Sequence, residues 1–113
     1  MEDCIFCKLA NGEIPTNIVY EDEFVTAFND MNPQAPTHIL VVPKKHYSSV
    51  LDVNDGDNII AKIYNAINII AKDQGFEKDG FRVINNCGEN AGQTVMHMHF
   101  HILAGKKLGE KIV

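Results

Sequence analysis

The chain has 113 residues, of which 45% are hydrophobic, and its formal net charge at pH 7 is −5. This length predicts one domain, residues 1–113, with a single core. The acidic balance argues against binding to polymeric nucleic acid, which needs many cations. Lys44-Lys45 and Lys106-Lys107 are the only basic clusters. A single nucleotide remains a possible ligand, because backbone amides and imidazoles can hold one phosphate.

Targeting and membrane signals are missing from the sequence. No apolar run has the length of a membrane span, and Glu2-Asp3 follows Met1 where a secretion signal carries basic and then apolar residues. We therefore expect a cytoplasmic protein with no membrane partner. Three cysteines, an odd number, do not indicate a disulfide framework.

The first half of the chain predicts one short helix and three strands. A helix is expected over residues 4–10, with Asp3 as its N-cap and Gly12 near its end. Strands are expected over 18–20 and 24–29, paired as a hairpin. After a loop with two prolines, a strand follows over 38–42 and stops at Pro43.

The second half predicts one long helix, from about Asp55 to Gln74, and two further strands, 81–86 and 95–103. The helix has an apolar stripe at helical spacing, made by Ile59, Ile63, Ile67 and Ile70. Ile60, Tyr64 and Ala71 widen this stripe, so one surface is expected to cover the sheet and another to meet a second subunit. The expected fold is α+β, an antiparallel sheet of about five strands with one long helix and a short N-terminal helix.

Two cysteines at the N-terminus, Cys4 and Cys7, have the C-x2-C spacing by which two thiolates reach one zinc ion. A tetrahedral site needs two further ligands. Without a metal, the same pair fits a reducible dithiol or two buried thiols. We favour zinc.

Histidines alternate with apolar residues near the C-terminus, in the run Met96-His97-Met98-His99-Phe100-His101-Ile102-Leu103. Successive side chains of a strand point to opposite faces, so His97, His99 and His101 are expected on one face. Three imidazoles in a row predict either a metal site or nucleophilic and acid–base chemistry on a phosphate. The polar loop before them, residues 85–94, contains two glycines and fits a nest of backbone amides around a phosphate.

These motifs resemble the histidine triad (HIT) superfamily, and in particular its Hint branch. The triad signature is His-Met-His-Phe-His-Ile-Leu, and the segments 33–38 and 43–46 are also similar to the Hint pattern. The resemblance extends over nearly the whole chain. It implies a purine nucleotide-binding phosphoramidase, active on AMP-type substrates, which forms a homodimer through the helix and the strand 81–86.

The resemblance also implies roles for individual residues. His99 takes the position of the nucleophile that forms a nucleotidyl-histidine, and a backbone carbonyl on a neighbouring strand is expected to fix its tautomer. His101, Gln93 and Thr94 take positions that contact phosphate oxygens, and Asp30 the position that accepts the ribose hydroxyls. His38 has a supporting role in catalysis. The remaining matched nucleotide positions are Ile5, Phe6, Leu9, Phe28, Met31, Asn86 and Gly92.

For the metal, the resemblance adds His46 and His97 to Cys4 and Cys7, which makes a structural Cys2His2 zinc site. Two other interpretations stay open. In one, the protein is a nucleotide-binding or protein-interaction module whose hydrolysis is incidental. In the other, a catalytic zinc binds His97, His99 and His101, and the cysteines are dispensable for the metal.

Overall fold

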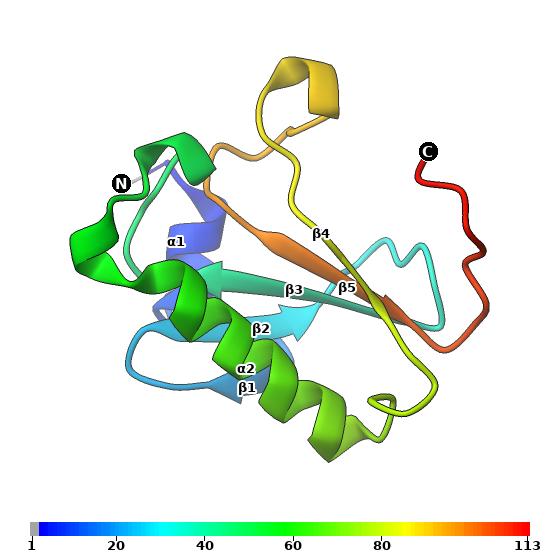
Figure 1. Cartoon of the computed structure of the whole chain (residues 1–113). Coiled ribbons are helices and arrows are strands. Elements are labelled where there is room, and N and C mark those ends of the chain that lie inside the picture. Colours follow the sequence, from blue (N-terminus) through cyan, green and yellow to red (C-terminus); the bar gives the residue numbers. More distant parts are fainter. Residues whose placement is uncertain (1–2) are drawn as a thin grey trace.

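The computed structural model describes residues 3–113, except the side chain of Asp55. Met1 and Glu2 lie outside the described residues. The expectation that the chain has no secretion signal rests partly on these two residues. The strands form one antiparallel sheet in the order β1-β2-β3-β5-β4 (Figure 1). The elements are α1 (Ile5–Ala10), β1 (Ile18–Glu21), β2 (Val25–Asn29), β3 (Thr37–Pro43), α2 (Ile59–Gln74), β4 (Arg82–Ile84) and β5 (Phe100–Ala104). This confirms the α+β expectation.

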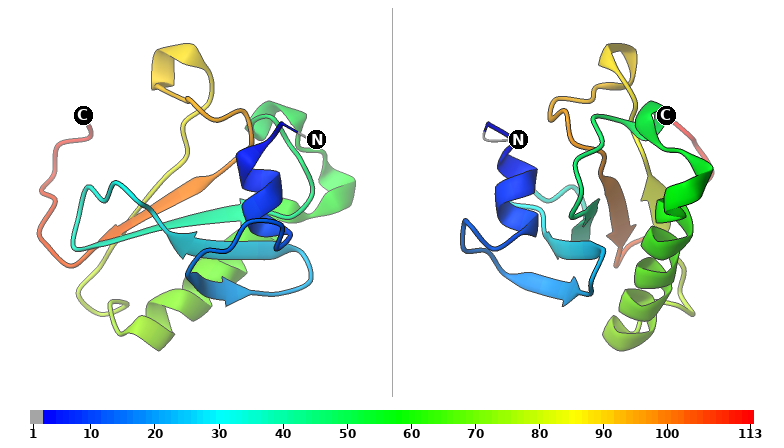
Figure 2. Two further views of the ribbon diagram at one scale, coloured as in Figure 1. Left: turned by 180° about the vertical axis from the view of Figure 1, so that it is seen from behind. Right: turned by 90° about the vertical axis from the view of Figure 1, so that its left-hand side faces the viewer.

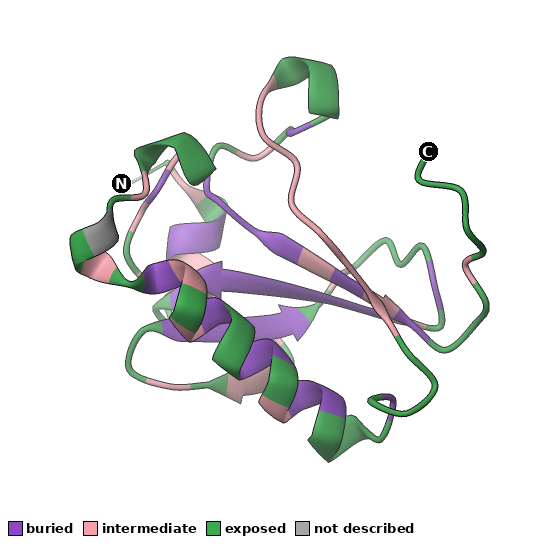
Figure 3. Ribbon diagram, in the orientation of Figure 1, coloured by how far each residue is buried: buried purple, intermediate pink, exposed green. Residues whose placement is uncertain are grey.

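The two helices cover opposite faces of the sheet (Figure 2). The long helix α2 packs on one face with the main apolar cluster, and the short helix α1 packs on the other face with a smaller cluster. The central strand β3 alternates between them. Ile39 and Val41 belong to the α2 side, whereas Leu40 and Val42 belong to the α1 side. Because both of its faces are covered, β3 is almost entirely buried (Figure 3).

Helix α2 begins later than the sequence predicted. It starts at Ile59, because a separate 3-10 turn over Asp55–Asp57 ends at Asn58, whose left-handed backbone (φ 53°) interrupts the helix. The predicted apolar stripe is correct: Ile59, Ile63, Ile67 and Ile70 are buried against the sheet. The helix ends at Gly75, also left-handed, as expected.

The strands that flank the candidate site are shorter than predicted. β4 covers Arg82–Ile84 and β5 begins at Phe100, so residues 95–99 are not part of the ladder. The amide of Met98 donates to the Tyr47 carbonyl (2.6 Å), which removes it from pairing with β3. The alternation nevertheless continues upstream of the strand, because Met98, Phe100 and Ile102 all pack on the α2 side.

Between residues 3 and 113, no helix is both long enough and apolar enough to cross a bilayer.

Candidate functional site

The histidines that precede and open β5 are directed to the α1 side of the sheet, opposite Met98 and Phe100. In the pairing of β5 with β3, His101 lies opposite Leu40, and His38 of β3 lies opposite Leu103. The ring centroids of His99 and His101 lie 5.1 Å apart. The structure therefore brings together the three side chains predicted for catalysis: His38, His99 and His101.

The ring of His99 is buried, and the structure determines which of its nitrogens carries the proton. Its Nδ1 lies 2.8 Å from the carbonyl oxygen of His97, and a carbonyl only accepts, so Nδ1–H is the donor. In the neutral ring, Nε2 is therefore the nitrogen with the lone pair. The expectation of a carbonyl on a neighbouring strand was wrong. The acceptor lies two residues upstream, because residues 97–99 are outside the sheet ladder.

A hydrogen-bond chain also fixes the tautomer of His101. The amide of Gln34 donates to Nδ1 of His38 (2.9 Å), so the Nε2 of His38 carries the proton and donates to Nδ1 of His101 (2.9 Å). The Nε2–H of His101 is then available as a donor. Asp30 stands beside this chain, with Oδ2 3.5 Å from the Nε2 of His38.

Burial keeps His101 neutral. Desolvation, followed by the proximity of His99 and His38, lowers its pKa from 6.5 to about 4. At neutral pH this side chain is therefore an uncharged donor with a fixed orientation.

One of the apolar residues predicted for a purine pocket, Phe6, lies against the histidines. The ring of Phe6 packs edge-on against His99 (centroids 5.0 Å apart) and against Phe28 (5.8 Å). Leu9 packs beside them. Ile5 and Met31 are not drawn into this cluster, since their relative exposures are 50% and 98%.

Ile5 instead lines a cavity of about 490 Å³ together with Thr94, Val95 and Met96. Two residues predicted to contact nucleotide, Ile5 and Thr94, therefore share one cavity. Another cavity, of about 510 Å³, lies between residues 76–82 and 105–109 and contains none of the predicted site residues.

The loop 85–94 is folded by its own hydrogen bonds. The amides of Ala91, Gly92 and Gln93 donate to carbonyls of Gly88 and Glu89, and the amide of Gly88 donates to the Gln93 side chain. The expected nest is therefore wrong for these four amides, since a 3-10 turn and Gln93 already use them. Gly92, at φ 82°, closes that turn in a conformation that favours glycine.

Gln93 holds this loop in place. Its Nε2 donates to the carbonyls of Ser48 (2.7 Å) and Val95 (3.0 Å), so both of its donors are used within the protein. Direct donation from Gln93 to a phosphate stays a prediction that requires one of these bonds to exchange. Thr94 is exposed, and Asn86 is half-buried just after β4.

Sequence reasoning missed two residues that support the site. The Nδ2 of Asn85 donates to the carbonyl of His99 (3.0 Å), and the carbonyl of Ser48 anchors Gln93. Asn85 directly follows β4, the strand next to β5, and this adjacency is the signal that could have identified it. Nothing local in the sequence marks Ser48.

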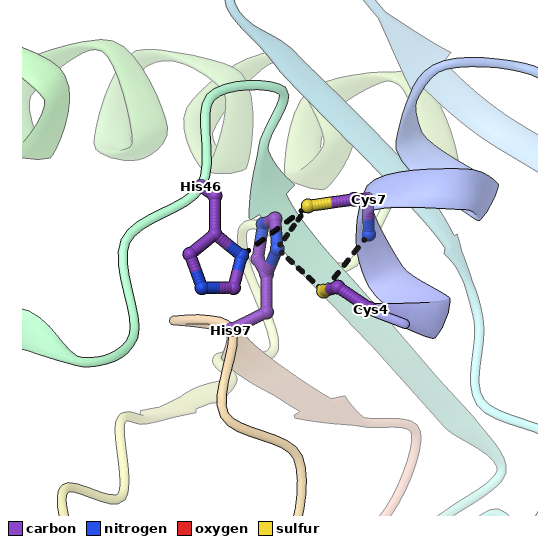
Figure 4. A group of neighbouring side chains, drawn as sticks. All are labelled: Cys4, Cys7, His46 and His97. Atoms are coloured by element: carbon purple, nitrogen blue, oxygen red, sulfur yellow. Dashed lines mark hydrogen bonds between the residues drawn. The ribbon is translucent and has the colours of Figure 1, made fainter. Parts of the chain in front are cut away.

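A second cluster, of Cys4, Cys7, His46 and His97, lies where α1 meets the start of the histidine run (Figure 4). One ligand atom from each residue lies within 4.8 Å of all the others. Nδ1 of His97 is 3.2 Å from the Sγ of Cys4 and 3.3 Å from that of Cys7, and Nδ1 of His46 is 3.2 Å from the Sγ of Cys7. The third cysteine, Cys87, is not part of it.

These four residues fit a tetrahedral metal ion. Sulfur and nitrogen ligands of one zinc ion lie about 3.6 Å apart, close to the observed separations. The Nε2–H of His97 donates to the Pro43 carbonyl (2.8 Å), so its Nδ1 lone pair is directed at both sulfurs. One lone pair accepts from only one thiol, whereas a cation at the centre satisfies all four ligands.

Burial sets the ionisation of this cluster in the metal-free protein. Desolvation, with the hydrogen bond to Cys4 next in size, raises the pKa of Cys7 to about 11. Desolvation also lowers the pKa of His97 to about 4. The interpretation with a metal on all three triad histidines is not supported, because among the described residues His97 clusters with the cysteines and not with His99 or His101.

Comparisons with known proteins agree with this geometry. Residues 11–108 match the HIT domain family. The chain is 42% identical to a purine nucleoside phosphoramidase of Escherichia coli over 109 residues, which cover 96% of this chain and 92% of that protein.

Solved structures are also similar. A histidine triad protein from Clostridium difficile superposes with a TM-score of 0.95 at 62% identity, over 98% of this chain and 97% of that one. A HIT family hydrolase from Clostridium thermocellum superposes with a TM-score of 0.96 at 46% identity, over 100% and 99% of the two chains. The chain belongs to the HIT family.

Proposed function

We propose that this protein is a hydrolase of purine nucleoside 5′-phosphoramidates, which cleaves the P–N bond between AMP or GMP and an amine. Membership of the HIT family supports this proposal. The Escherichia coli relative named purine nucleoside phosphoramidase supports it further, because the two chains align over almost their whole lengths.

One observation carries the proposal: the ring of His99, whose Nδ1 donates to a backbone carbonyl, lies beside the ring of His101, whose Nδ1 accepts from His38 (centroids 5.1 Å apart). A nucleophile needs a lone pair, and the His97 carbonyl leaves it on Nε2 of His99. An electrophilic phosphate needs a donor for its developing negative charge, and the chain from Gln34 through His38 leaves a proton on Nε2 of His101.

The reaction then has two displacements. Nε2 of His99 attacks phosphorus, the P–N bond breaks, and the amine leaves with a proton taken from solvent. Water next attacks phosphorus and gives up a proton to solvent, the P–N bond to His99 breaks, and the nucleoside monophosphate is released with the free neutral histidine. Donation from His101 and the Thr94 hydroxyl to the phosphate oxygens stabilises both transition states.

Binding of the nucleoside uses the residues around Phe6. The base packs on the apolar side chains, with Phe6 between His99 and Phe28, while the Asp30 carboxylate accepts the ribose hydroxyls. The apolar set comprises Phe6, Leu9 and Phe28, and Ile5 and Met31, which lie outside this cluster, stay predicted contacts of the base. Asn86 and Gly92 contribute from the loop on the phosphate side.

Turnover of an adenosine 5′-phosphoramidate that carries a fluorescent amine tests this function. We expect the wild-type protein to release the amine, and His99→Ala to lose more than about 99% of this activity while AMP still binds. Asn17→Ala, exposed directly before β1 at the sheet edge away from the histidines and from α2's exposed Tyr64, is the control and should retain full activity. A wild-type protein that binds AMP tightly but releases no amine would instead be a nucleotide-binding module.

We also propose that Cys4, Cys7, His46 and His97 hold a structural zinc ion. Zinc would tie α1 to the segments that carry His46 and His97, and it would supply no step of the hydrolysis. Metal analysis of the purified protein should give one zinc per chain. Cys4→Ser should lose it and Cys87→Ser should keep it, and equal zinc in both variants would contradict the assignment.

A further inference from the structure

His97 takes part in both clusters. Its side chain is fully buried and contacts the two cysteine sulfurs (Figure 4). Its Nε2–H donates to the Pro43 carbonyl, and its own backbone carbonyl accepts the Nδ1–H of His99. Only Met98 separates the two residues in the sequence. The orientation of the His97 peptide therefore depends on one cluster and determines the hydrogen bond in the other.

Phe6 makes a second link between the clusters. It lies between Cys4 and Cys7 on α1, and its ring contacts both His99 (centroids 5.0 Å apart) and His97 (6.2 Å). A displacement of the two cysteines would therefore move the ring that packs against His99.

Helix α1 has little stability of its own. It spans six residues, has no acidic residue in its first turn, and its N-cap acceptor is the Sγ of Cys4, 3.3 Å from the Cys7 amide. Helices this short are not stable in isolation, so tertiary contacts determine the position of α1. The cysteine–histidine cluster supplies such contacts at the N-terminal end of the helix.

We propose that His97 is a positioning residue. When the cluster holds its metal, the His97 carbonyl and Phe6 keep His99 in the Nδ1–H tautomer with Nε2 aimed at phosphorus. This inference rests on the proposed function, since His99 is taken as the nucleophile. It assigns the metal cluster an effect on the rate of attack in addition to its effect on stability.

Substitutions at His46 give the sharpest test of whether the metal cluster affects the attack by His99. His46 belongs to the cluster and makes hydrogen-bond or ring contacts with Cys7, His97 and Ser48, a set that does not include His99. His46→Ala removes one ligand. His46→Cys removes the same imidazole ring but restores four ligands, as Cys3His, which zinc accepts. Any effect of lost ring packing is common to both variants, so the two differ only in metal binding.

Three quantities are measured for the wild type and both variants: zinc per chain, kcat and KM for the phosphoramidate, and the ring ¹⁵N shifts of His99. We expect His46→Ala to lose zinc and to lower kcat about tenfold, with KM changed less than about threefold, because a misdirected nucleophile slows attack more than it weakens binding. The ¹⁵N shifts of His99 should move from a pure Nδ1–H tautomer to a mixture. His46→Cys should restore the zinc, kcat and shifts.

Unchanged kcat and unchanged His99 shifts in zinc-free His46→Ala would overturn the proposal. Failure of His46→Cys to restore kcat with zinc bound would also overturn it, as would global unfolding of zinc-free protein in its amide spectrum, since the metal would then support the whole fold. If wild-type protein hydrolyses no phosphoramidate, the proposed function fails separately, and the His99 shifts still report whether the metal fixes the tautomer.

Discussion

The lowered pKa of His101 predicts how the stability of the protein depends on pH. Its pKa is lowered to about 4 in the folded state by burial, then by His99 and His38, whereas the unfolded chain has an ordinary histidine near 6.5. Unfolding therefore takes up a proton between these values. The contribution of His101 to stability is complete above about pH 6.5 and is lost progressively as the pH falls towards 4.

The measurement is urea unfolding of wild type and His101→Gln at pH 7 and pH 5. We expect the wild type to lose about 2 kcal/mol more than the variant over this interval, from the protonation of an unfolded-state histidine. The cysteine–histidine cluster is present in both proteins, so its contribution to the pH-dependent free energy of unfolding cancels in the difference between them. Equal losses in the two proteins would show that His101 has an ordinary pKa when folded.

His38 provides a second prediction at this scale. His38→Leu removes the donor to Nδ1 of His101 and the acceptor of the Gln34 amide, so the tautomer of His101 is no longer fixed. We expect kcat for the phosphoramidate to fall at least about tenfold. His38→Gln keeps one donor and one acceptor and should retain more activity. Activity of His38→Leu equal to wild type would leave His38 without the supporting role we assign to it.

At the scale of elements, the sequence was most informative where a side-chain period continues over many residues. The isoleucine stripe identified α2 and its buried face, and the alternation around His99 identified which residues share a face. The boundaries were less predictable, because they depend on partners distant in the sequence. β5 starts late because Tyr47 binds the Met98 amide and Asn85 binds the His99 carbonyl.

In the candidate site too, the features that follow a sequence motif were predictable, and those that depend on distant contacts were not. The metal-ligand set of Cys4, Cys7, His46 and His97 is an expectation from the resemblance, and the structure brings these four side chains together. The loop 85–94 was harder to predict, since its glycines indicate turns but not which donors remain free. Gln93 uses one of its two donors on Ser48, 45 residues away, and no local pattern encodes that contact.

For the whole molecule, the prediction is a homodimer. β4 is an edge strand of the sheet, and Tyr64 on α2 is 44% exposed although its ring also packs against Phe100. An unpaired edge beside exposed apolar surface favours association with a second copy. Light scattering should give twice the chain mass of 12.6 kDa.

A pair of variants tests which surface is used. Tyr64→Glu should shift the protein towards a monomer at micromolar concentration, because it places a charge on the predicted interface. Ile18→Glu is the matched control: Ile18 has the same 44% exposure but lies on β1, at the opposite edge of the sheet. A monomeric wild type, or dissociation by Ile18→Glu instead, would contradict this interface.

The cysteine–histidine cluster has a consequence for the newly made chain. Cys4 and Cys7 are synthesised well before His97, which lies 93 residues after Cys4. A cation that met the growing chain at that stage would find two thiols, and its coordination would be completed only after the segment through β4 has been translated. Full coordination of the ion would therefore distinguish chains that extend through His97 from shorter ones, which hold two or three ligands and would release the ion more readily.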